Sequence, residues 1–459
     1  MEFLEKQMRS TFNIKPLVTA ITALSVASIA SAAGLSRSEQ DVSAFLQDGT
    51  YAETVYTYID ADVTGKDKYG NKIKDIAESY DYFRYGVKTD INDTFSVGVL
   101  YDEPWGAAAD YTGNNIFVAQ GDKDATVKHI SEGQLPNYAA AGAVYNDLLT
   151  KFENATDEAT KKALGSKLKE VGATIKTADH DASIKGEETK VEVRTESLTG
   201  LVGMKFGQNK EFQVYGGPVA QRLKANVNLR GNAYLVLDGY DLNVNPETDY
   251  GWIAGFQYTK PEIGLKAALT YRSEIDYDIP VAERVPVSST PELTVTDMKV
   301  TTPESVNFDF QTGINPTTLA TAKVRWVSWS DFAVTPPLYN KTSKEKYPQG
   351  LDLINYDDDQ WLVELGLAKR VADNLAISGT VGWDSGAGNP VTSLGPVEGY
   401  YSVGLGAKYD MTKNWSISAG GKYLWIGDAK GNIPNGAEVS TFEDNDGYAL
   451  GIKLSYQDK

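Results

Sequence analysis

Apolar and polar positions alternate along most of this chain, most regularly toward its C-terminus. From Tyr448 to Tyr456 every second residue is apolar, and the intervening positions hold Ala, Gly, Lys and Ser. Residues 401–409 and 415–425 repeat the pattern, again with Tyr or Trp at the ends of the apolar face. A period of two predicts β-strands. The aromatic ends and the polar opposite face favour a membrane barrel with a wet lumen over a soluble sandwich, which would bury the apolar faces.

The same alternation predicts an all-β fold, a 14-stranded antiparallel transmembrane β-barrel. An even number of strands is what single-chain bacterial barrels have. The predicted strands are 53–63, 80–91, 95–105, 199–206, 212–229, 249–258, 264–277, 305–313, 319–332, 360–370, 375–384, 401–409, 415–425 and 448–456.

Short and long connections between these strands alternate strictly. The short turns lie near residues 92, 208, 261, 316, 373 and 413. The long connections are 64–77, 107–188, 231–247, 279–303, 333–358, 386–398 and 427–444. Outer-membrane barrels have short periplasmic turns and longer extracellular loops, so the alternation indicates the same orientation here, with both ends of the barrel on the periplasmic side.

The N-terminus carries the pattern of an export signal. Lys6, Arg9 and Lys15 precede an apolar run that ends in Ala30-Ser31-Ala32, a small-x-small cleavage site. We therefore expect residues 1–32 to be a signal peptide, although a buried N-terminal helix is the alternative. Residues 33–50 are too short for a domain and too apolar for a plain linker. We expect them to form a plug inside the lumen of the barrel (51–459), with Arg37, Gln40 and Phe45 among the plug residues.

The long insertion at 107–188 interrupts the strand pattern. Val144, Leu148 and Phe152 recur at helical spacing, and a similar series follows between residues 164 and 171. Thr156 is the predicted N-cap of the second helix and Gly172 its predicted stop. The prediction is a helical hairpin within 135–175 in one extracellular loop; a small soluble subdomain is the alternative, but the insertion is too short to bury much core.

Composition excludes several function classes. The net charge of −18 argues against nucleic acid, which needs a basic surface. Beyond residue 32 no apolar run reaches the length of a membrane helix. The chain has no Cys and no G-x-S-x-G motif, and its two His, His129 and His180, lack metal-ligand spacing. We expect no enzyme activity, no catalytic residues, no metal and no cofactor.

The phase of the strands places several cations in the lumen. A ligand carboxylate is held most strongly by charge-assisted hydrogen bonds, and Arg can grip it with two. The candidate headgroup-binding residues are Arg325, Arg84, Arg272, Lys323, Lys422 and Lys453. Barrels also line their lumens with paired charges, and the acidic residues that share this phase are Glu274, Asp309, Glu364 and Asp384.

Pro104 interrupts the third predicted strand. Proline lacks an N–H and fixes φ, so a strand passing through it loses a ladder bond and bends. With Trp105 and Gly106 beside it, this stretch is a candidate lateral opening in the wall. The alternative is that the strand ends at the surface there.

Three stretches resemble the FadL family, the outer-membrane channels for long-chain fatty acids and other hydrophobic molecules. They are Gly34–Ser38 with its continuation through Gly49–Glu53 to Asp60, then Tyr80–Gly106, and Pro303–Phe332. The chain departs from the family in lacking an Asn-Pro-Ala motif in the plug and in ending on Gln457-Asp458-Lys459. The resemblance implies a kink in the third strand at Pro104, lateral exit of substrate into the outer membrane, and a monomer.

Together these features predict a Gram-negative outer-membrane channel for passive uptake of fatty acids, aromatic hydrocarbons or similar compounds. Tyr138, Tyr145 and Phe152 in the insertion are the candidate capture site. Expected partners besides the substrate are outer-membrane lipid, lipopolysaccharide and the barrel-assembly machinery. Two other functions stay open: a nonspecific porin for small polar solutes, and a structural or adhesive surface barrel.

Overall fold

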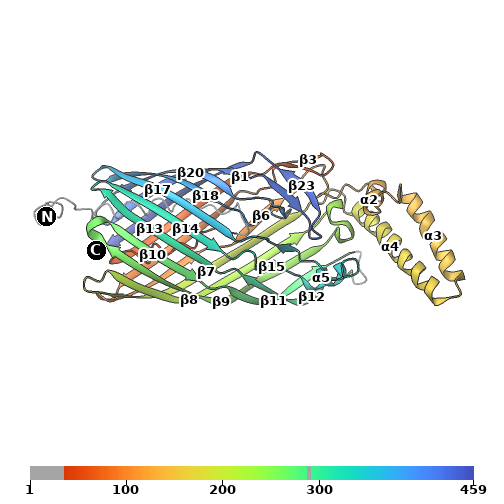
Figure 1. Ribbon diagram of the computed structural model, residues 1–459, viewed down its shortest axis with the longest axis horizontal. Coiled ribbons are helices and arrows are strands. Elements are labelled where there is room, and N and C mark those ends of the chain that lie inside the picture. Colours follow the sequence, from red (N-terminus) through yellow and green to blue (C-terminus); the bar gives the residue numbers. More distant parts are fainter. Residues whose placement is uncertain (1–35, 287–290, 459) are drawn as a thin grey trace, which may run out of the picture.

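The last strand of the chain pairs with the first and closes a barrel. The computed structural model describes residues 36–286 and 291–458. Within them, β24 (Asp446–Asp458) lies antiparallel to β1 (Thr50–Asp62) along its whole length. The result is a closed antiparallel barrel of 14 spans, with helices projecting from one end (Figure 1), and the predicted fold class is confirmed. The expected signal peptide, 1–32, lies outside the described residues.

Three of the spans consist of two strands separated by a short interruption. They are β5 with β6 (Phe95–Asp102 and Gly106–Asp110), β10 with β11 (Leu265–Arg272 and Ile275–Arg284), and β12 with β13 (Thr294–Thr302 and Ser305–Asn315). The uninterrupted spans between β1 and β24 are β4 (Tyr80–Asp90), β7 (Lys190–Phe206), β8 (Phe212–Asn228), β9 (Asp241–Lys260), β14 (Thr318–Val327), β17 (Gln360–Ala372), β18 (Leu375–Asp384), β20 (Tyr400–Asp410) and β21 (Trp415–Ile426).

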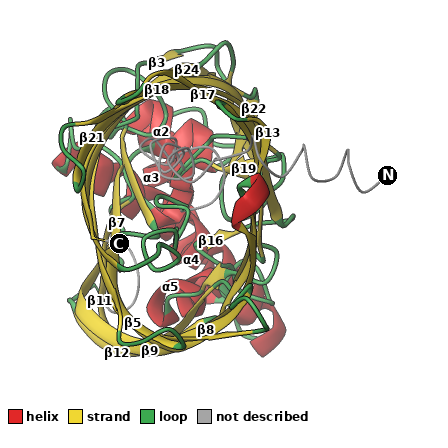
Figure 2. Ribbon diagram, turned by 90° about the vertical axis from the view of Figure 1, so that its left-hand side faces the viewer, coloured by secondary structure: helices red, strands yellow, loops and turns green. Residues whose placement is uncertain are grey.

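The alternation of short and long connections is confirmed. Each short turn lies at the end of the barrel that carries the C-terminus, seen end-on in Figure 2. We call the barrel wall next to these turns the turn-side half, and the wall next to the long connections the loop-side half. The long connections hold the small strands β2 (Gly65–Asp67), β3 (Lys72–Ile73), β15 (Ala333–Val334), β16 (Ile354–Asn355), β19 (Val391–Thr392), β22 (Ala429–Asn432) and β23 (Glu438–Phe442), with the short helices η2 (Asn232–Leu237) and α5 (Pro337–Ser343). One turn-side connection holds η3 (Pro261–Ile263).

Several strands reach further into the loop-side half than the sequence predicted. Residues 279–303 were predicted as a loop, but β11 and β12 occupy most of that range. Likewise, β7 begins at Lys190 rather than near 199, and β9 begins at Asp241 rather than 249. The prediction was wrong there because it required an apolar face toward lipid. In these stretches most outward positions are polar or charged, with Val295 on β12 and Pro280 on β11 as exceptions.

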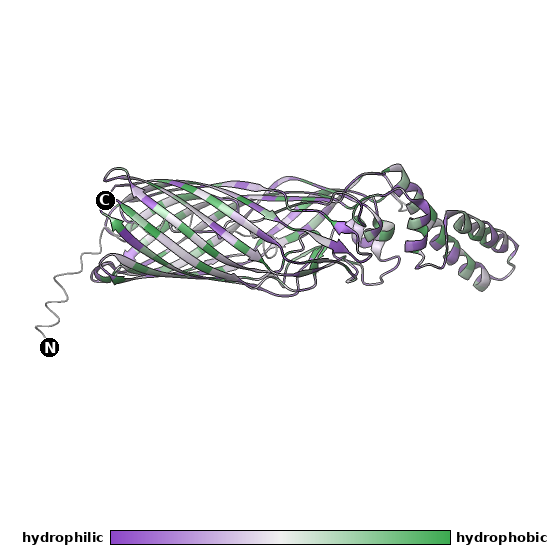
Figure 3. Ribbon diagram, turned by 90° about the horizontal axis from the view of Figure 1, so that it is seen from above, coloured by the Kyte–Doolittle hydropathy of each residue, from purple (hydrophilic) through white to green (hydrophobic). Residues whose placement is uncertain are grey.

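The polarity of the wall reverses between the two halves, as β7 shows. In the turn-side half its outward residues include Leu198, Val202 and Met204, each at least 40% exposed. In the loop-side half its outward residues are Glu192, Arg194 and Glu196, while Val191 and Val193 turn inward and are buried. The turn-side half therefore suits an apolar surround, and the loop-side half encloses an apolar core. Figure 3 shows the green residues recurring along the strands of the turn-side half.

An aromatic row marks the boundary between the two halves. Trp383, Tyr401 and Trp425 are register partners on three adjacent strands, and all three point outward. Tyr409 ends the same outward face of β20 at the turn side. The eight residue steps from Tyr401 to Tyr409 span about 27 Å of strand, which tilt reduces to about 20 Å along the barrel axis. This is close to the apolar band of outer-membrane barrels.

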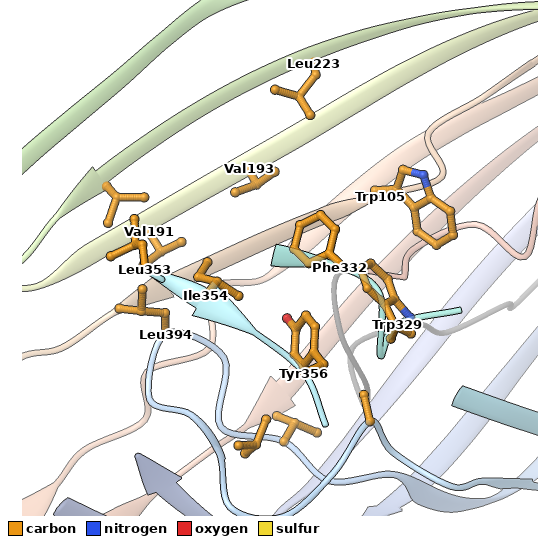
Figure 4. Packing of buried hydrophobic residues seen from close by; sticks show 14 of the residues in the cluster. Trp105, Val191, Val193, Leu223, Trp329, Phe332, Leu353, Ile354, Tyr356 and Leu394 are labelled. Carbon is orange, nitrogen blue, oxygen red and sulfur yellow. The ribbon is translucent and has the colours of Figure 1, made fainter. Parts of the chain in front are cut away.

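The core of the loop-side half is built around aromatic rings in edge-to-face contact (Figure 4). Trp329 is fully buried, and its ring centroid lies 5.2 Å from those of Trp105 and Phe332 and 5.3 Å from that of Tyr356. Leu353, Ile354 and Leu394 from the long connections pack into the same cluster. These residues belong to one continuous buried cluster.

Three helices project beyond the loop-side half: α2 (Lys123–Ile130), α3 (Tyr138–Asn154) and α4 (Glu158–Ser183). The helical hairpin was predicted, but both ends of its second helix were wrong. The N-cap is Asp157, whose side chain accepts from the Thr160 N–H, and not Thr156. The helix continues through Gly172 because that position faces Tyr145 of α3, and a Cβ there would lie 3.2 Å from the tyrosine ring. Of the helices in 36–286 and 291–458, none is long and apolar enough to span a membrane.

Candidate functional site

All six predicted headgroup cations point into the barrel. Arg84, Arg272, Arg325 and Lys453 are each at most 5% exposed, Lys422 is 8% exposed, and the Lys323 side chain is 14% exposed. They come from strands around the whole circumference, namely β4, β10, β14, β21 and β24. Lys323 and Arg325 lie together on β14, and Arg84 and Lys453 share the Glu53 carboxylate. The six cations therefore do not form one cluster.

The N-terminal segment, residues 36–49, lies inside the barrel and supplies partners for Lys323 and Arg325. The Glu39 carboxylate is 2.6 Å from the Lys323 ammonium. Arg325 donates from Nη1 to the Glu39 carbonyl (3.0 Å) and from Nη2 to the Gln40 side-chain oxygen (2.9 Å). Both cations on β14 are therefore occupied by groups of the chain itself.

A second acid–base group surrounds Arg84. Its guanidinium lies 3.1 Å from Asp41 of the N-terminal segment and 3.5 Å from Glu53 on β1. The Lys453 ammonium is 3.7 Å from the same Glu53 and has no hydrogen-bond partner among the described residues. Lys422 pairs closely with Glu364. These pairs balance the interior charge and hold β1, β4 and β24 to the N-terminal segment.

Arg272 differs from the other five cations. It ends β10 at the interruption before β11 and is 4% exposed. Its Nε and Nη1 groups have no acceptor in the described part of the chain. The charges of Asp102 and Arg325 act on it, the first attractive and the second repulsive. A buried N–H without a partner costs free energy, so these two donors favour an acceptor that arrives from elsewhere.

The third span breaks at residues 103–105, between β5 and β6, so Pro104 and Trp105 lie in the break and Gly106 begins β6. On one side, Trp105 exchanges hydrogen bonds with Thr195 on β7. On the other side, the N-terminal segment takes the place of a neighbouring strand: Arg37 N–H donates to the Pro104 carbonyl (2.7 Å) and Ser36 forms a β-bridge with Trp105. The break is thus closed by residues 36–38, and Pro104 is not simply the end of the strand, because the chain continues as β6.

Arg37 strengthens this closure with its side chain. Its Nε donates to the Gly106 carbonyl (2.6 Å), and its guanidinium lies 3.9 Å from the centre of the Tyr80 ring. Gly106 is required for this approach, because a Cβ there would lie 2.8 Å from the Val193 carbonyl and 3.2 Å from Arg37 Nε. An apolar cavity of about 60 Å³ adjoins the closure, and its lining includes Arg37, Ile59, Ile76, Leu394 and Val397.

Phe45 anchors the other end of the N-terminal segment. It is fully buried, and its ring lies 5.7 Å from that of Tyr215 on β8. Gly98 and Gly203 make room for this ring: a Cβ on either would lie within 3.0 Å of it. Gly86 makes room for Ala44 in the same way, at 2.6 Å. The wall of the turn-side half is hollowed here to receive the segment.

The three predicted capture residues lie on the α3 face that packs against α4. Tyr138 donates to Asp179 (2.8 Å), Tyr145 packs over Gly172, and Phe152 packs over Gly165. All three are partly buried rather than fully exposed. A shallow hollow beside Phe152 is lined by residues that include Thr150, Ala155 and Leu164. The hairpin therefore packs largely on itself.

A buried carboxyl pair lies at the base of the projecting helices, outside the barrel wall. Asp181 on α4 accepts from the Gly121 N–H (2.9 Å) and Asp238 accepts from the Gly231 N–H (2.7 Å); both residues are fully buried. Their other oxygens, Asp181 Oδ1 and Asp238 Oδ2, face each other, and neither has a hydrogen-bond donor among the residues that the structure describes. Burial, reinforced by the charge of Asp181, raises the pKa of Asp238 to about 7. Burial also raises the pKa of Asp181.

Sequence reasoning missed several residues of this interior. Glu39 and Asp41 occupy the cations, Ser38 donates to Asp102 (3.0 Å), and Asn307 donates to the Glu39 carbonyl (2.7 Å). The acidic residues within the predicted plug were the available signal, since buried carboxylates need cationic partners. In 36–286 and 291–458, no group of three His, Cys, Asp or Glu is arranged to hold a metal ion.

Comparison with known proteins supports the resemblance. A family model described as outer membrane protein transport protein (OMPP1/FadL/TodX) matches residues 172–457. A Pseudomonas aeruginosa FadL homologue aligns with TM-score 0.59 at 14% identity, covering 89% of this chain and 90% of that chain. The P. putida toluene transporter TodX aligns with TM-score 0.54 at 12% identity (90% and 91% covered). The Ralstonia pickettii toluene transporter TbuX aligns with TM-score 0.51 at 11% identity (90% and 90% covered). At these identities the structures establish a shared fold. No curated protein matches the chain.

Proposed function

Because this chain belongs to the outer membrane protein transport family (OMPP1/FadL/TodX), we propose that it takes up long-chain fatty acids or similar hydrophobic carboxylates by passive diffusion. The protein lies in the outer membrane, and its family members are channels for hydrophobic compounds. The finer proposal concerns the substrate class and the route.

The main support for a carboxylate substrate comes from the hydrogen-bond donors of Arg272. Its buried Nε and Nη1 groups, which have no acceptor among the described residues, lie near Arg325 in the barrel interior. A carboxylate is the acceptor that satisfies such donors best, because charge-assisted hydrogen bonds are about twice as strong as neutral ones. The Trp105 and Trp329 rings next to Arg325 offer an apolar surface for the start of the tail.

The proposed route starts at the projecting helices and ends in the membrane. Tyr138, Tyr145 and Phe152, which are partly exposed on α3, form the first capture surface. The headgroup then passes to Arg272 and its neighbours, and the tail leaves sideways at Pro104, Trp105 and Gly106. The N-terminal segment acts as the plug. The apolar cavity lined by residues 106–109 supports this exit, since it adjoins the break in the third span.

A neutral aromatic hydrocarbon is the second candidate substrate. Two of the structures with this fold are toluene transporters. A hydrocarbon would use the apolar cavity and the aromatic core but would leave the Arg272 donors without an acceptor among the described residues. The state of Arg272 therefore favours the carboxylate.

The test is oleate binding to the refolded barrel, followed by tryptophan fluorescence, with the wild type and Arg272→Gln compared. Removing one charge-assisted contact is expected to weaken oleate binding by about tenfold or more. Arg222→Gln is the matched control, because Arg222 lies on the outer face of β8 and pairs only loosely with Glu196 (3.9 Å). Saturable binding of toluene without binding of oleate would instead establish the hydrocarbon, and no binding of either would refute the proposal.

A further inference from the structure

Two neighbouring spans of the barrel wall lose their hydrogen-bond ladder over part of their length. β9 pairs with β10 as far as Ile253 and pairs with β11 again from Val244. Between these two ladders, residues 245–252 of β9 and 273–280 of the next span are all described by the structure, and no ladder pair joins them. Each stretch still has its other neighbour, β8 for β9 and β12 for β11. We call this interval the β9–β11 ladder gap.

The ladder is absent because the two spans shift their inward and outward positions at different places. β9 shifts at residues 245–246, where its register against β8 changes, whereas the next span shifts at residues 273–274, between β10 and β11. Both flanking ladders have the same register, so the buried Ile275 lies opposite Tyr250, which is 71% exposed. A ladder requires that opposed residues lie on the same face of the sheet. Within the gap this condition fails.

Side chains hold the wall together along the gap. At its turn-side end, the Ser273 N–H donates to the Trp252 carbonyl, and the Ser273 hydroxyl accepts from the Trp252 N–H, both at 3.0 Å. Further along, Tyr277 reaches from β11 past β9 to β8, where its hydroxyl donates to the Gln221 carbonyl (3.0 Å). Parting β9 from β11 along the gap therefore breaks no ladder pair.

The sequence of both stretches keeps the facing edges free. Pro246 on β9 and Pro280 on β11 have no N–H to give to a ladder. Gly251 leaves room for Ile275, since a Cβ on Gly251 would lie 2.7 Å from Ile275 Cγ1. Ile275 is 2% exposed, so an apolar side chain fills this part of the gap from the inside.

The gap adjoins Arg272 on the inner face of the wall and Trp252 on the outer face. Arg272 is the last residue of β10, and its Nε and Nη1 groups have no acceptor in the described part of the chain. Trp252 is 52% exposed, and its ring lies 5.0 Å from that of Tyr271. Beyond Trp252 and Tyr250 the outward residues of β9 are polar. The gap therefore begins at the boundary between the turn-side and loop-side halves.

Carboxylates line the outer face of the gap. Glu274, Asp276 and Asp278 are all exposed there. These charges repel a ligand carboxylate but do not repel a hydrocarbon chain. A fatty acid bound at this place therefore keeps its headgroup inside, on Arg272, and directs its tail outward.

From this arrangement we infer that the β9–β11 ladder gap is a binding slot in the wall for the hydrocarbon tail of a ligand whose carboxylate is held by Arg272, and that the tail reaches the membrane boundary beside Trp252. The inference rests on the proposed function and deepens it, because it adds a second site for the tail, apart from the break at Pro104–Gly106. The slot opens when Ile275 and Tyr277 turn aside and the facing strands part.

The first experiment locates the tail with 9,10-dibromostearate, whose bromine atoms quench the fluorescence of a tryptophan that they contact. Trp252→Phe is expected to lose most of the saturable quenching. Trp361→Phe is the matched control and is expected to keep it, because Trp361 is 46% exposed on the outer face of β17, away from the gap. Loss of quenching in Trp105→Phe instead, with Trp252→Phe unchanged, would place the tail at the third span and overturn the inference.

The second experiment holds the gap shut. Thr248→Cys combined with Asp276→Cys provides two exposed thiols on opposite sides of the gap, and the chain has no other Cys. Joining them with a short bis-maleimide is expected to weaken dibromostearate binding several-fold relative to the same protein before cross-linking. Asn243→Cys combined with Ala282→Cys is the matched control, because these two residues are ladder partners outside the gap. Cross-linking this pair is expected to leave binding unchanged.

The outcomes separate this inference from the proposed function. Binding that is lost in Arg272→Gln but unaffected by the cross-link across the gap would overturn the slot and leave the carboxylate channel intact. Quenching that is equal in the wild type, Trp252→Phe and Trp105→Phe would overturn the slot as well. Absence of dibromostearate binding in the wild type would overturn both the slot and the proposed substrate class.

Discussion

The two halves of the barrel wall follow the same strand alternation with opposite polarity. In the turn-side half, Leu405 and Val202 face outward and are more than half exposed, while Arg84 and Lys453 face inward. In the loop-side half, outward positions such as Asp276 and Asp278 are charged, and the inward Tyr277 and Ile279 are buried. At the level of Trp383, Tyr401 and Trp425, the outward face of a strand thus changes from apolar to polar and the inward face from polar to apolar. The two-residue period of the strand stays the same.

The difference shows what stabilises each half. The turn-side half depends on an apolar surround outside and on charge pairs with the N-terminal segment inside. The loop-side half depends on a packed core, like a soluble protein, with water outside. The break at Pro104–Gly106 lies where the two interiors meet, because Trp105 belongs to the aromatic core and also contacts Arg325. Lumen chemistry and core packing therefore adjoin at the proposed exit.

The largest expected effect comes from breaking the loop-side core. Trp329→Ala removes a fully buried ring that contacts Trp105 and Tyr356, and truncation of this kind costs about 3–5 kcal/mol. Hydrogen exchange of β11 and β12 should rise accordingly. Trp383→Ala, which truncates a Trp that is 40% exposed on the outer face, is the control and should cost less. An equal cost for both would mean that the loop-side half has no core of its own.

The next prediction tests whether lipid or water lies outside each half of the barrel wall. Leu405→Arg places a charge midway between Tyr401 and Tyr409 and is expected to reduce the free energy of unfolding in lipid vesicles by about 2–4 kcal/mol. Val295→Arg makes a similar change on the outer face of β12, where Val295 is 65% exposed, and is expected to cost within about 0.5 kcal/mol. Urea titration of both variants decides the comparison. Equal costs would contradict the assignment of lipid to the turn-side half.

The smallest effect concerns pH and the carboxyl pair under the projecting helices. A carboxyl whose pKa is raised by folding keeps its proton to a higher pH than in the unfolded chain, which loses it near pH 4. Its contribution to the free energy of unfolding is therefore complete below about pH 4. For Asp238, whose pKa is about 7, the contribution is lost as the pH rises through 7. Above pH 7 the two buried carboxylates repel each other. The charge of Asp122 adds to this repulsion and that of Arg230 opposes it. His180 lies beside Gly239 and is neutral, because burial lowers its pKa. We expect α4 to loosen from its base between pH 6 and 8.

Asp238→Asn supplies the control for that prediction. An amide can donate to Asp181 at every pH, so docking of α4 should no longer depend on pH. Tryptic cleavage of α4 should be several-fold faster in the wild type than in the variant at pH 8 and equal at pH 6. Comparison at the same pH cancels the pH dependence of the protease. A wild-type to variant ratio that is the same at both pH values would refute the shared proton.

The sequence by itself determined the architecture. Period-two alternation is a local property, visible within eight or nine residues, and it was sufficient for the number of spans and for the phase of Arg84, Arg325 and Lys453. The order of short and long connections was sufficient to place the short turns together at one end of the barrel. The alternation pattern failed to predict the strands at 190–198 and 294–302. The strands continue there, but their outward face meets water, and the prediction required apolar outward positions.

Only the tertiary structure decided which charges meet. Glu39 and Lys323 are 284 residues apart, and Asp181 and Asp238 belong to different elements. Such contacts depend on barrel closure and on the path of the N-terminal segment through the lumen, which no local pattern encodes. Phase could place six cations inside, but it could not tell that Lys323 and Arg325 are bonded to the chain's own residues while Arg272 keeps two donors without an acceptor in the described chain. The physical reason is that periodicity fixes the face of a strand, whereas partners are fixed by register and by long-range closure.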